Sequence, residues 1–326
     1  LRRALDACLV ALALLVAVPS LASHRVVDVQ GKVLLQRKRP QGWAPPQPIR
    51  RPGVAVVSDD RIEVKSGSEA LVRCASPGRR LWTVDPGGPF PVSRGCGADS
   101  ILRLARREEG LPGGGDPRIP FLITPRASLV TGQPLTVRWN PVPGVAGYQL
   151  WLVRQRDRQL LWGARVVNSS SVALPPTAAL VPGEAYVFVV EADDSTSSQL
   201  DPGASQQAFR RATPDEESRL ARDLAALPLA KLDPEAAALV RADVQRSHGF
   251  LNDAIHTLED SLRRHPASLS TLLELGQLYG AVGLNRWAME RYRQAAGLAA
   301  ASDDPDALAE AQSGATSAQR RFQSGL

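Results

Sequence analysis

The last third of the chain has the hydrophobic pattern of amphipathic α-helices. Apolar residues return every three or four positions and define one face of each predicted helix, at Leu251, Ala254, Ile255 and Leu258 and again at Leu272, Leu275, Leu278 and Tyr279. Residues that can cap a helix N-terminus precede the predicted segments, namely Thr213, Asp233, Ser268 and Asp304. The pattern predicts an all-helical region over residues 213–326.

Two of the predicted helical units, 235–268 and 269–302, share a pattern of residues that recurs at a spacing of 34 residues. Small and bulky residues recur in register, in the pairs Ala242 and Gly276, Gly249 and Gly283, Ala254 and Ala288, Leu258 and Tyr292, and Ser261 and Ala295. A repeat of this length is typical of stacked helix pairs, in which each pair buries its apolar face against a neighbour. We expect residues 303–326 to form a terminal helix that covers the exposed end of the stack.

The first two thirds of the chain have a different pattern, typical of short β-strands. Runs of apolar and β-branched residues alternate with turns rich in Gly, Pro, Ser and Asp. They occur at 26–35, 53–57, 61–64, 70–74 and 81–84, and then at 135–139, 148–153, 160–162, 165–167 and 186–192, whereas the Pro-rich segment 37–51 predicts a loop. Each set predicts a small β-roll or sandwich, over 23–109 and 119–212, joined by a Gly- and Pro-rich linker at 110–118. The fold class is therefore multidomain, with two all-β modules before an all-α array.

The helical unit 269–302 resembles the tetratricopeptide repeat. Its packing positions match that family at Gly276, Tyr279, Gly283, Ala288, Tyr292 and Ala295. Leu272 stands where that family often has Trp, and Ala300 where Pro is usual. The resemblance implies a concave partner groove lined by the first helix of each unit, here by Leu239, Asp243, Arg246, Ser270, Leu273 and Gln277. The alternative is that these residues only shape the superhelix.

Each predicted β module also resembles a known family. Trp139, Tyr148 and the Pro-Gly turn before Tyr186 are similar to a fibronectin type III domain, whose tyrosine corner bonds the Tyr hydroxyl back to the preceding loop. Trp151 and Trp162 either fill this module or form an exposed stacking platform for sugar. Residues 58–70 resemble a turn and hairpin of the FecR-like β domain of bacterial envelope proteins, although Ser58 stands where Gly is expected.

The first residues have the features of a secretory signal peptide. A short basic stretch, an apolar run from Ala7 to Val18 and a small-x-small site ending at Ala22 predict cleavage after residue 22. The alternative is an uncleaved anchor, although the run is shorter than the ~20 residues of a spanning helix. We expect export to the periplasm or the cell surface, with no transmembrane segment after cleavage. Export would favour a disulfide between Cys74 and Cys96 over two free thiols or a metal site.

Charge divides the chain into a basic front and an acidic end. Residues 24–109 carry 16 Lys and Arg against 9 Asp and Glu, a net charge of +7, whereas residues 214–326 carry 12 against 16, a net charge of −4. Basic surfaces attract polyanions. The front module is therefore a candidate binder of an anionic glycan or lipid, and genome composition is the alternative explanation for its Arg content. No nucleic acid partner is expected for an exported chain.

The sequence contains no catalytic constellation that we recognise. His24, His248, His256 and His265 lack the spacing of a helical zinc pair, and we expect them to be solvated. No nucleophile elbow or phosphate-binding loop is present. We therefore expect neither enzymatic activity nor a cofactor or metal. The sequence favours a non-enzymatic exported scaffold that binds an envelope or secreted protein through its helical repeats, with polyanion binding by the basic β module as the alternative.

Overall fold

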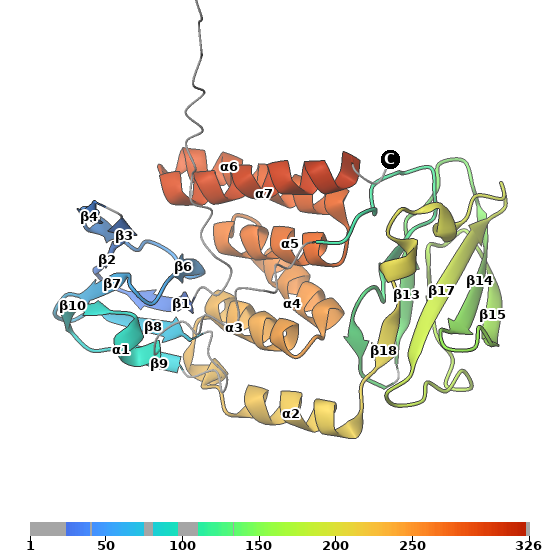
Figure 1. Ribbon diagram of the computed structural model, residues 1–326, viewed down its shortest axis with the longest axis horizontal. Helices are drawn as coiled ribbons and strands as arrows, with labels where there is room; N and C mark the ends of the chain where they lie inside the picture. The colour runs from blue at the N-terminus through green and yellow to red at the C-terminus, as the bar shows by residue number, and fades with distance from the viewer. Residues whose placement is uncertain (1–23, 40, 75–80, 97–109, 133, 324–326) are drawn as a thin grey trace, which may run out of the picture.

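The computed structural model describes residues 24–39, 41–74, 81–96, 110–132 and 134–323. A helical array (residues 213–323) stands in the middle, and the two β modules lie on opposite sides of it (Figure 1). The predicted fold class, two β modules followed by a helical array, is confirmed. The predicted signal peptide at 1–22 lies outside the described residues.

In its described residues, the N-terminal module (residues 24–96) has two four-stranded sheets that enclose a core of Val26, Val33, Ile62 and Val72, and a small two-stranded hairpin. The first sheet has the order β6-β1-β8-β9, formed by β1 (His24–Gln30), β6 (Val54–Val56), β8 (Glu69–Arg73) and β9 (Leu81–Val84). The second has the order β10-β7-β2-β5, formed by β2 (Val33–Gln36), β5 (Gln47–Pro48), β7 (Arg61–Val64) and β10 (Gly87–Pro91).

The segment 37–51 is not the loop that its Pro content predicted. It forms the small hairpin of β3 (Lys38–Arg39) and β4 (Gly42–Trp43), and then the edge strand β5. Pro48 is tolerated in β5 because an edge strand leaves one row of backbone groups unpaired. Lys38 and Arg61 lie over the ring of Trp43, 4.6 and 3.9 Å from its centroid, and cover its apolar face.

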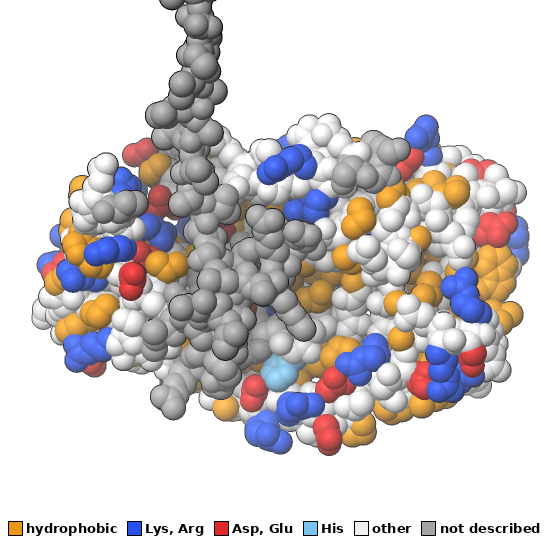
Figure 2. All heavy atoms as spheres, viewed as in Figure 1, with side chains coloured by type: hydrophobic (Ala, Val, Ile, Leu, Met, Phe, Trp, Pro, Cys, Tyr) orange, Lys and Arg blue, Asp and Glu red, His pale blue; other side chains and the backbone are white. Residues whose placement is uncertain are grey.

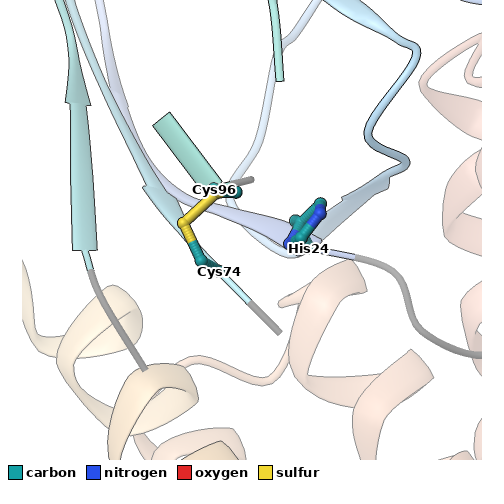
Figure 3. A group of neighbouring side chains, drawn as sticks. All are labelled: His24, Cys74 and Cys96. Atoms are coloured by element: carbon teal, nitrogen blue, oxygen red, sulfur yellow. A yellow bond between two sulfur atoms is a disulfide. The ribbon is translucent and has the colours of Figure 1, made fainter. Parts of the chain in front are cut away.

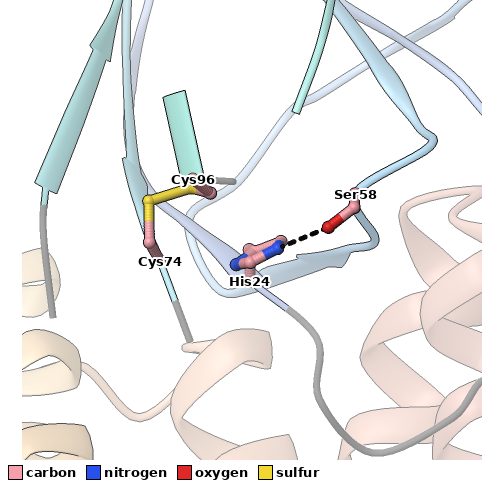
Figure 4. The surroundings of a disulfide bond; sticks show 4 residues. All are labelled: His24, Ser58, Cys74 and Cys96. Carbon is pink, nitrogen blue, oxygen red and sulfur yellow. Dashed lines mark hydrogen bonds between the residues drawn. A yellow bond between two sulfur atoms is a disulfide. The ribbon is translucent and has the colours of Figure 1, made fainter. Parts of the chain in front are cut away.

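The predicted disulfide between Cys74 and Cys96 is confirmed. It joins the residue that follows β8 to the short helix α1 (Ser93–Cys96), with a Cα–Cα distance of 5.0 Å (Figure 4). His24 lies beside it at the start of β1, is 2% exposed, and its Nε2 is 3.1 Å from Ser58 Oγ. The expectation that this histidine is solvated was wrong, because the alternation of β1 places it on the same inner face as Val26.

The second β module (residues 119–212) is a sandwich of one three-stranded and one five-stranded sheet. The smaller sheet has the order β11-β13-β16, formed by β11 (Leu122–Thr124), β13 (Thr136–Trp139) and β16 (Ser171–Ala173). The larger has the order β12-β18-β17-β14-β15, formed by β12 (Leu129–Val130), β14 (Gly147–Arg154), β15 (Leu160–Val167), β17 (Ala185–Ala192) and β18 (Phe209–Arg211).

The aromatic residues that carry the resemblance to a fibronectin type III domain, Trp139, Tyr148 and Tyr186, all lie in the core of the sandwich. Trp139 and Tyr148 meet edge to face in the core, with ring centroids 5.4 Å apart. The hydroxyl of Tyr186 accepts a hydrogen bond of 2.7 Å from the backbone N–H of Val181, so the predicted tyrosine corner is confirmed. Trp162 packs edge to face against Phe188. Trp151 is partly buried and lies on the opposite face of the sheet from Trp162.

Over the described residues 213–323, the array has six α-helices. They are α2 (Pro214–Ala225), α3 (Pro234–Ser247), α4 (Leu251–Arg264), α5 (Leu269–Ala281), α6 (Asn285–Ala301) and α7 (Pro305–Gln323). Thr213 and Glu216 form a reciprocal capping box at α2, and the side chains of Asp233, Ser268 and Asp304 accept hydrogen bonds from the first turns of α3, α5 and α7. Within the described residues, we find no helix long and apolar enough to span a membrane.

The 34-residue repeat corresponds to two stacked helix pairs, α3 with α4 and α5 with α6. Gly249 and Gly283 occupy the two turns, with φ values of +84° and +76° that favour glycine. Gly276 on α5 lies against the ring of Tyr292 on α6, and a Cβ at this position would be 2.7 Å from the ring. These close approaches explain why small residues recur at this spacing.

Candidate binding groove of the helical array

The predicted groove residues come from the first helix of each pair. Leu239, Asp243 and Arg246 lie on α3, and Ser270, Leu273 and Gln277 lie on α5. Spacings of three or four residues place each set on one helix face. The groove is not open in the structure: the N-terminal module covers this face, and strands β1 and β8 and the turn at 51–53 meet α3, α5 and the start of α7 (Figure 1).

The first contact between the module and the groove is made by Arg25 of β1. Its Nη1 is 2.6 Å from Glu274 Oε1, and its Nη2 donates to Gln277 Oε1 at 3.1 Å. Nη1 also donates to the carbonyl of Gly53 at 2.8 Å, which holds the guanidinium in place within its own module. The side chains of Arg25 and Glu274 are only 11% and 8% exposed, so this ion pair is largely shielded from water.

The second contact joins Arg73, at the end of β8, to Asp243 on α3. The other oxygen of Asp243 accepts from Arg246 Nη2 at 2.7 Å, so one groove carboxylate binds two guanidinium groups. Arg73 is adjacent to Cys74, and the disulfide therefore anchors the backbone from which it projects. Arg73 is also the register partner of Arg25 across β1 and β8. Because like charges opposite each other destabilise a sheet, the two array carboxylates relieve a repulsion inside the module.

The third contact is made by the turn that precedes β6. Arg51 Nε is 3.1 Å from Asp304 Oδ2 at the start of α7, and its Nη1 donates to Ser270 Oγ at 3.4 Å. The Ser270 hydroxyl donates to the carbonyl of Pro52. Gly53 follows with φ +83°, and a Cβ there would be 2.9 Å from that of Ser270, so this turn fits tightly onto the start of α5.

Apolar contact between the module and the groove is limited. The narrow cleft that remains between them is lined by Arg25, Val27, Gly53, Leu239, Asp243 and Glu274. Val27 and Leu239 supply its apolar side chains and are 4% and 6% exposed. Among the described residues, no residue belongs to both the core of the N-terminal module and the core of the array. Charge and hydrogen bonds therefore carry most of this junction.

The junction on the other side of the array is of a different kind. Ile119, Phe121 and Ile123 of the sandwich module belong to the same core cluster as Leu275 and Leu278 of the array. The backbone N–H of Leu129 also donates to the carbonyl of Gly249 at 2.9 Å. The sandwich and the array are therefore joined by a continuous apolar interior.

Arg126 lies at the centre of this second junction and is 0% exposed. Its Nη2 is 2.9 Å from Asp201 Oδ2, its Nη1 donates to the carbonyl of Leu122, and its other donors reach the carbonyls of Val282 and Gly283 in the turn between α5 and α6. Burial lowers the pKa of the Arg126 guanidinium and the Asp201 carboxylate opposes that shift. A cation is retained here because each of the three guanidinium nitrogens donates to an acceptor.

The segment 110–118, which the sequence predicts as a linker, lies against the array. Asn285 Nδ2 donates to the carbonyls of Leu111 and Gly113, at 2.8 and 3.1 Å. The backbone N–H of Gly114 donates to Asp201 at 2.8 Å, and residues 113–115 are buried. Side chains at these glycines would collide with their neighbours, for example with the ring of Phe322 at Gly115. Glycine here serves close packing as well as chain reversal.

The groove contains charged residues that the sequence analysis missed. Glu274 and Asp304 on the array, and Arg25, Arg51 and Arg73 on the module, were not among the predicted site residues. Glu274 had a recognisable signal in the sequence, because it is a single carboxylate in the apolar run 272–275. In the structure it is buried, with 6% of its surface exposed. The arginines had none, because three distant segments contribute them.

One further cluster brings together groups that can bind metals. A ring nitrogen of His24 and the sulfurs of Cys74 and Cys96 lie within 4.8 Å of one another, all buried (Figure 3). The sulfurs are bonded to each other, and a disulfide offers no thiolate. The group is therefore a disulfide with a neighbouring histidine.

The face of the N-terminal module that is seen in Figure 2 does not present a single basic patch. Basic, acidic and apolar side chains are interspersed over it. Four of its arginines, Arg25, Arg37, Arg51 and Arg73, pair with carboxylates of the array. The exposed basic residues are Lys32, Lys38, Arg39, Arg50 and Lys65. Part of the net +7 charge is thus paired within the molecule.

Comparison with known proteins finds remote structural similarity to two solved structures. No protein-family model and no curated protein matches the chain. A tetratricopeptide repeat domain protein from Salinibacter ruber is 23% identical, with 27% of this chain and 97% of that chain covered and a TM-score of 0.25. The chicken CNTN1 FN1–FN3 domains are 14% identical, with 53% of this chain and half of that chain covered (50%) and a TM-score of 0.19. Because both TM-scores are low, the description of the sandwich and of the helix pairs rests on the contacts within this chain.

Proposed function

We propose that this protein is a non-enzymatic scaffold that binds a protein partner through the groove between α3, α5 and the start of α7. One observation carries the proposal: the groove holds a folded protein surface, and it does so with Asp243, Glu274 and Asp304. A surface that already accommodates strand ends and a turn has the shape and the chemistry for protein recognition.

The groove also defines the chemistry of its partner. Its carboxylates and the amide of Gln277 receive guanidinium groups, which present several donors in a fixed plane. A lysine offers only a point charge and would satisfy fewer of these acceptors. The partner class is therefore a protein that presents arginine side chains on a β surface or an extended segment.

Location in the periplasm or at the cell surface is part of the same proposal. It is supported by the Cys74–Cys96 disulfide, since disulfides persist in oxidising compartments, and by the signal-like pattern over residues 1–22. The proposal includes the finer identities of the modules, namely a FecR-like domain, a fibronectin type III domain and tetratricopeptide repeats. Their support is the residue patterns that carry each resemblance.

Three full-length baits test this function on an extract of the envelope fraction. The unchanged chain and a Glu290→Gln control, altered at an exposed position on α6, should retain one defined protein. Asp243→Asn/Glu274→Gln should lose it, because the acceptors for the partner's arginines are gone. Equal retention by all three baits would show that the groove is not the binding surface.

A second candidate function is binding of an anionic glycan or lipid by the N-terminal module. The exposed basic residues Lys32, Lys38, Arg39, Arg50 and Lys65 favour it. Retention on anionic vesicles should then fall steeply as salt screens the exposed charges. Substituting Lys38 and Arg39 by Ala should reduce binding, whereas the Asp243→Asn/Glu274→Gln variant should bind the vesicles at least as well as the unchanged chain.

A further inference from the structure

The two junctions of the array differ in the forces that hold them. The sandwich shares an apolar core with the array, and Arg126 is buried across that boundary. The N-terminal module keeps its own core and its own disulfide, and it meets the array through ion pairs and hydrogen bonds. Interfaces of the second, polar type permit domains to move relative to each other, whereas large apolar interfaces do not.

We propose that the N-terminal module is a releasable cover of the groove, and that a protein partner binds the same carboxylates when the module has left. This inference rests on the proposed function, because it gives that groove a closed state and an open state. The sandwich and the array act together as the fixed platform in both states.

The contacts of the closed state have the properties that a competing ligand requires. They come from the side chains of Arg25 and Arg73, from the segment 51–53, and from a longer, exposed pair of Arg37 with Asp306 at 3.8 Å. They are not continued by strand pairing or by a shared core. Three acceptors, Asp243, Glu274 and Asp304, would become available when the module leaves. A partner with arginines at a similar spacing would then recover the same ion pairs.

The cross-strand pair of Arg25 and Arg73 ties the module's internal stability to its location on the array. In the closed state each guanidinium has an acidic partner on a different helix. After release, the two like charges remain opposite each other in the sheet, in water. Contact with an acidic surface therefore stabilises a module that carries this pair. Arg39 and Arg50, which are exposed, provide a control in which two arginines are also replaced.

The experiment uses the full chain and cleaves it only after folding. A specific protease site is inserted after Ser100, between the module and the rest of the chain. After cleavage, size-exclusion chromatography is run at low and at high ionic strength, where the Debye length falls from about 10 Å at 0.1 M to about 3 Å at 1 M. Salt screens these buried pairs little while the module is attached, but it screens the same charges once release exposes them to water. We therefore expect the two fragments to elute together at low ionic strength and apart at high ionic strength.

Variants separate a charged contact from a permanent one. Arg25→Ala/Arg73→Ala should release the cleaved module even at low ionic strength, and Arg39→Ala/Arg50→Ala should not. Asp243→Asn/Glu274→Gln removes the same contacts from the array side, so the test does not depend on the folding of one variant. Co-elution of the fragments under every condition and in every variant would overturn the inference.

Rebinding supplies a quantitative readout. The released N-terminal fragment, labelled and with its disulfide intact, is titrated into the remaining fragment at several salt concentrations. We expect at least tenfold weaker binding for Arg25→Ala/Arg73→Ala than for the Arg39→Ala/Arg50→Ala control. Equal affinities would overturn the inference.

The two proposals fail in different ways. If the proposed function were wrong, the cleaved module would still dissociate, but the Arg25→Ala/Arg73→Ala bait would capture no protein from the envelope extract. If the cover were permanent, the module would stay bound after cleavage, whatever the baits capture. If both proposals hold, the Arg25→Ala/Arg73→Ala bait captures more partner than the unchanged chain.

Discussion

Arg126 and Asp201 form an ion pair of 2.9 Å that is closed to water, and both residues belong to the sandwich. The same guanidinium donates to two carbonyls in the turn between α5 and α6. Asp201 in turn accepts from the backbone of Gly114 and the amide of Gln207. A single buried pair thus connects the sandwich, the segment 110–118 and the helical array.

Substitution of Arg126 by Met should destabilise the protein by about 3–5 kcal/mol, because it leaves the Asp201 carboxylate buried without its cation. Urea unfolding of the full chain measures this loss. The double variant Arg126→Met/Asp201→Asn should lose less than the single variant, since no uncompensated charge remains. Arg118→Met, at an exposed pair with Asp116, should have no measurable effect. A similar loss in both Arg→Met variants would contradict the assigned role of Arg126.

Gly276→Ala and Gly297→Ala should change stability in opposite directions, although both glycines lie within helices. A Cβ at Gly276 would be 2.7 Å from the Tyr292 ring, which is buried and has no room to shift, so we expect a loss of about 1–3 kcal/mol. At Gly297 nothing lies within 4 Å, and alanine should stabilise α6 by about 0.5–1 kcal/mol. Thermal unfolding followed by far-UV circular dichroism distinguishes the two. A gain in stability for Gly276→Ala would show that the packing between α5 and α6 is looser than described.

Loss of the disulfide should weaken both the N-terminal module and its contact with the array. The bond closes a loop with a sequence separation of 22 residues, for which chain entropy predicts about 3 kcal/mol of stability. Cys74→Ala/Cys96→Ala should therefore lower the urea midpoint of this module. Because Arg73 is adjacent to Cys74, the variant should also release the cleaved module at lower salt. Protease digestion checks the expectation that the sandwich and array stay protected.

Acid should remove a stabilising contact at the start of α2. The pKa of Glu216 is lowered from 4.5 to about 2, first by its hydrogen bonds with Arg210 and then by the backbone N–H of Thr213. Because the folded-state pKa is the lower one, this contribution is present above pH 4.5 and is lost as the pH falls towards 2. Solvent screens the partly exposed pair, so we expect about 1 kcal/mol.

The Glu216→Gln variant provides the control for this pH dependence. It keeps the shape of the side chain but cannot ionise. The difference in unfolding free energy between the unchanged chain and the variant should shrink as the pH is lowered from 4.5 towards 2. A difference that is constant over this range would show that the charge of Glu216 contributes nothing to the cap.

Local features of the molecule could be predicted from the sequence because their causes lie within a few residues. The four helix caps at Thr213, Asp233, Ser268 and Asp304 depend on a side chain and the turn that follows it. The tyrosine corner depends on a spacing of five residues between Val181 and Tyr186. The repeat of Gly249 and Gly283 reflects two equivalent turns. The two cysteines left after the predicted cleavage define one disulfide.

The sequence by itself determined the helices, most strands, the disulfide and the helix positions of the predicted groove residues. Only the tertiary structure decided that the N-terminal module covers these positions. Arg25, Arg51 and Arg73 look like ordinary surface arginines in the sequence, as does Arg126. Their acidic partners are far away along the chain. The separation is 75 residues between Arg126 and Asp201, and 253 residues between Arg51 and Asp304. Charge has no periodicity that reveals a partner, and the placement of one folded module on another depends on the summed fit of surfaces that only the assembled chain brings together.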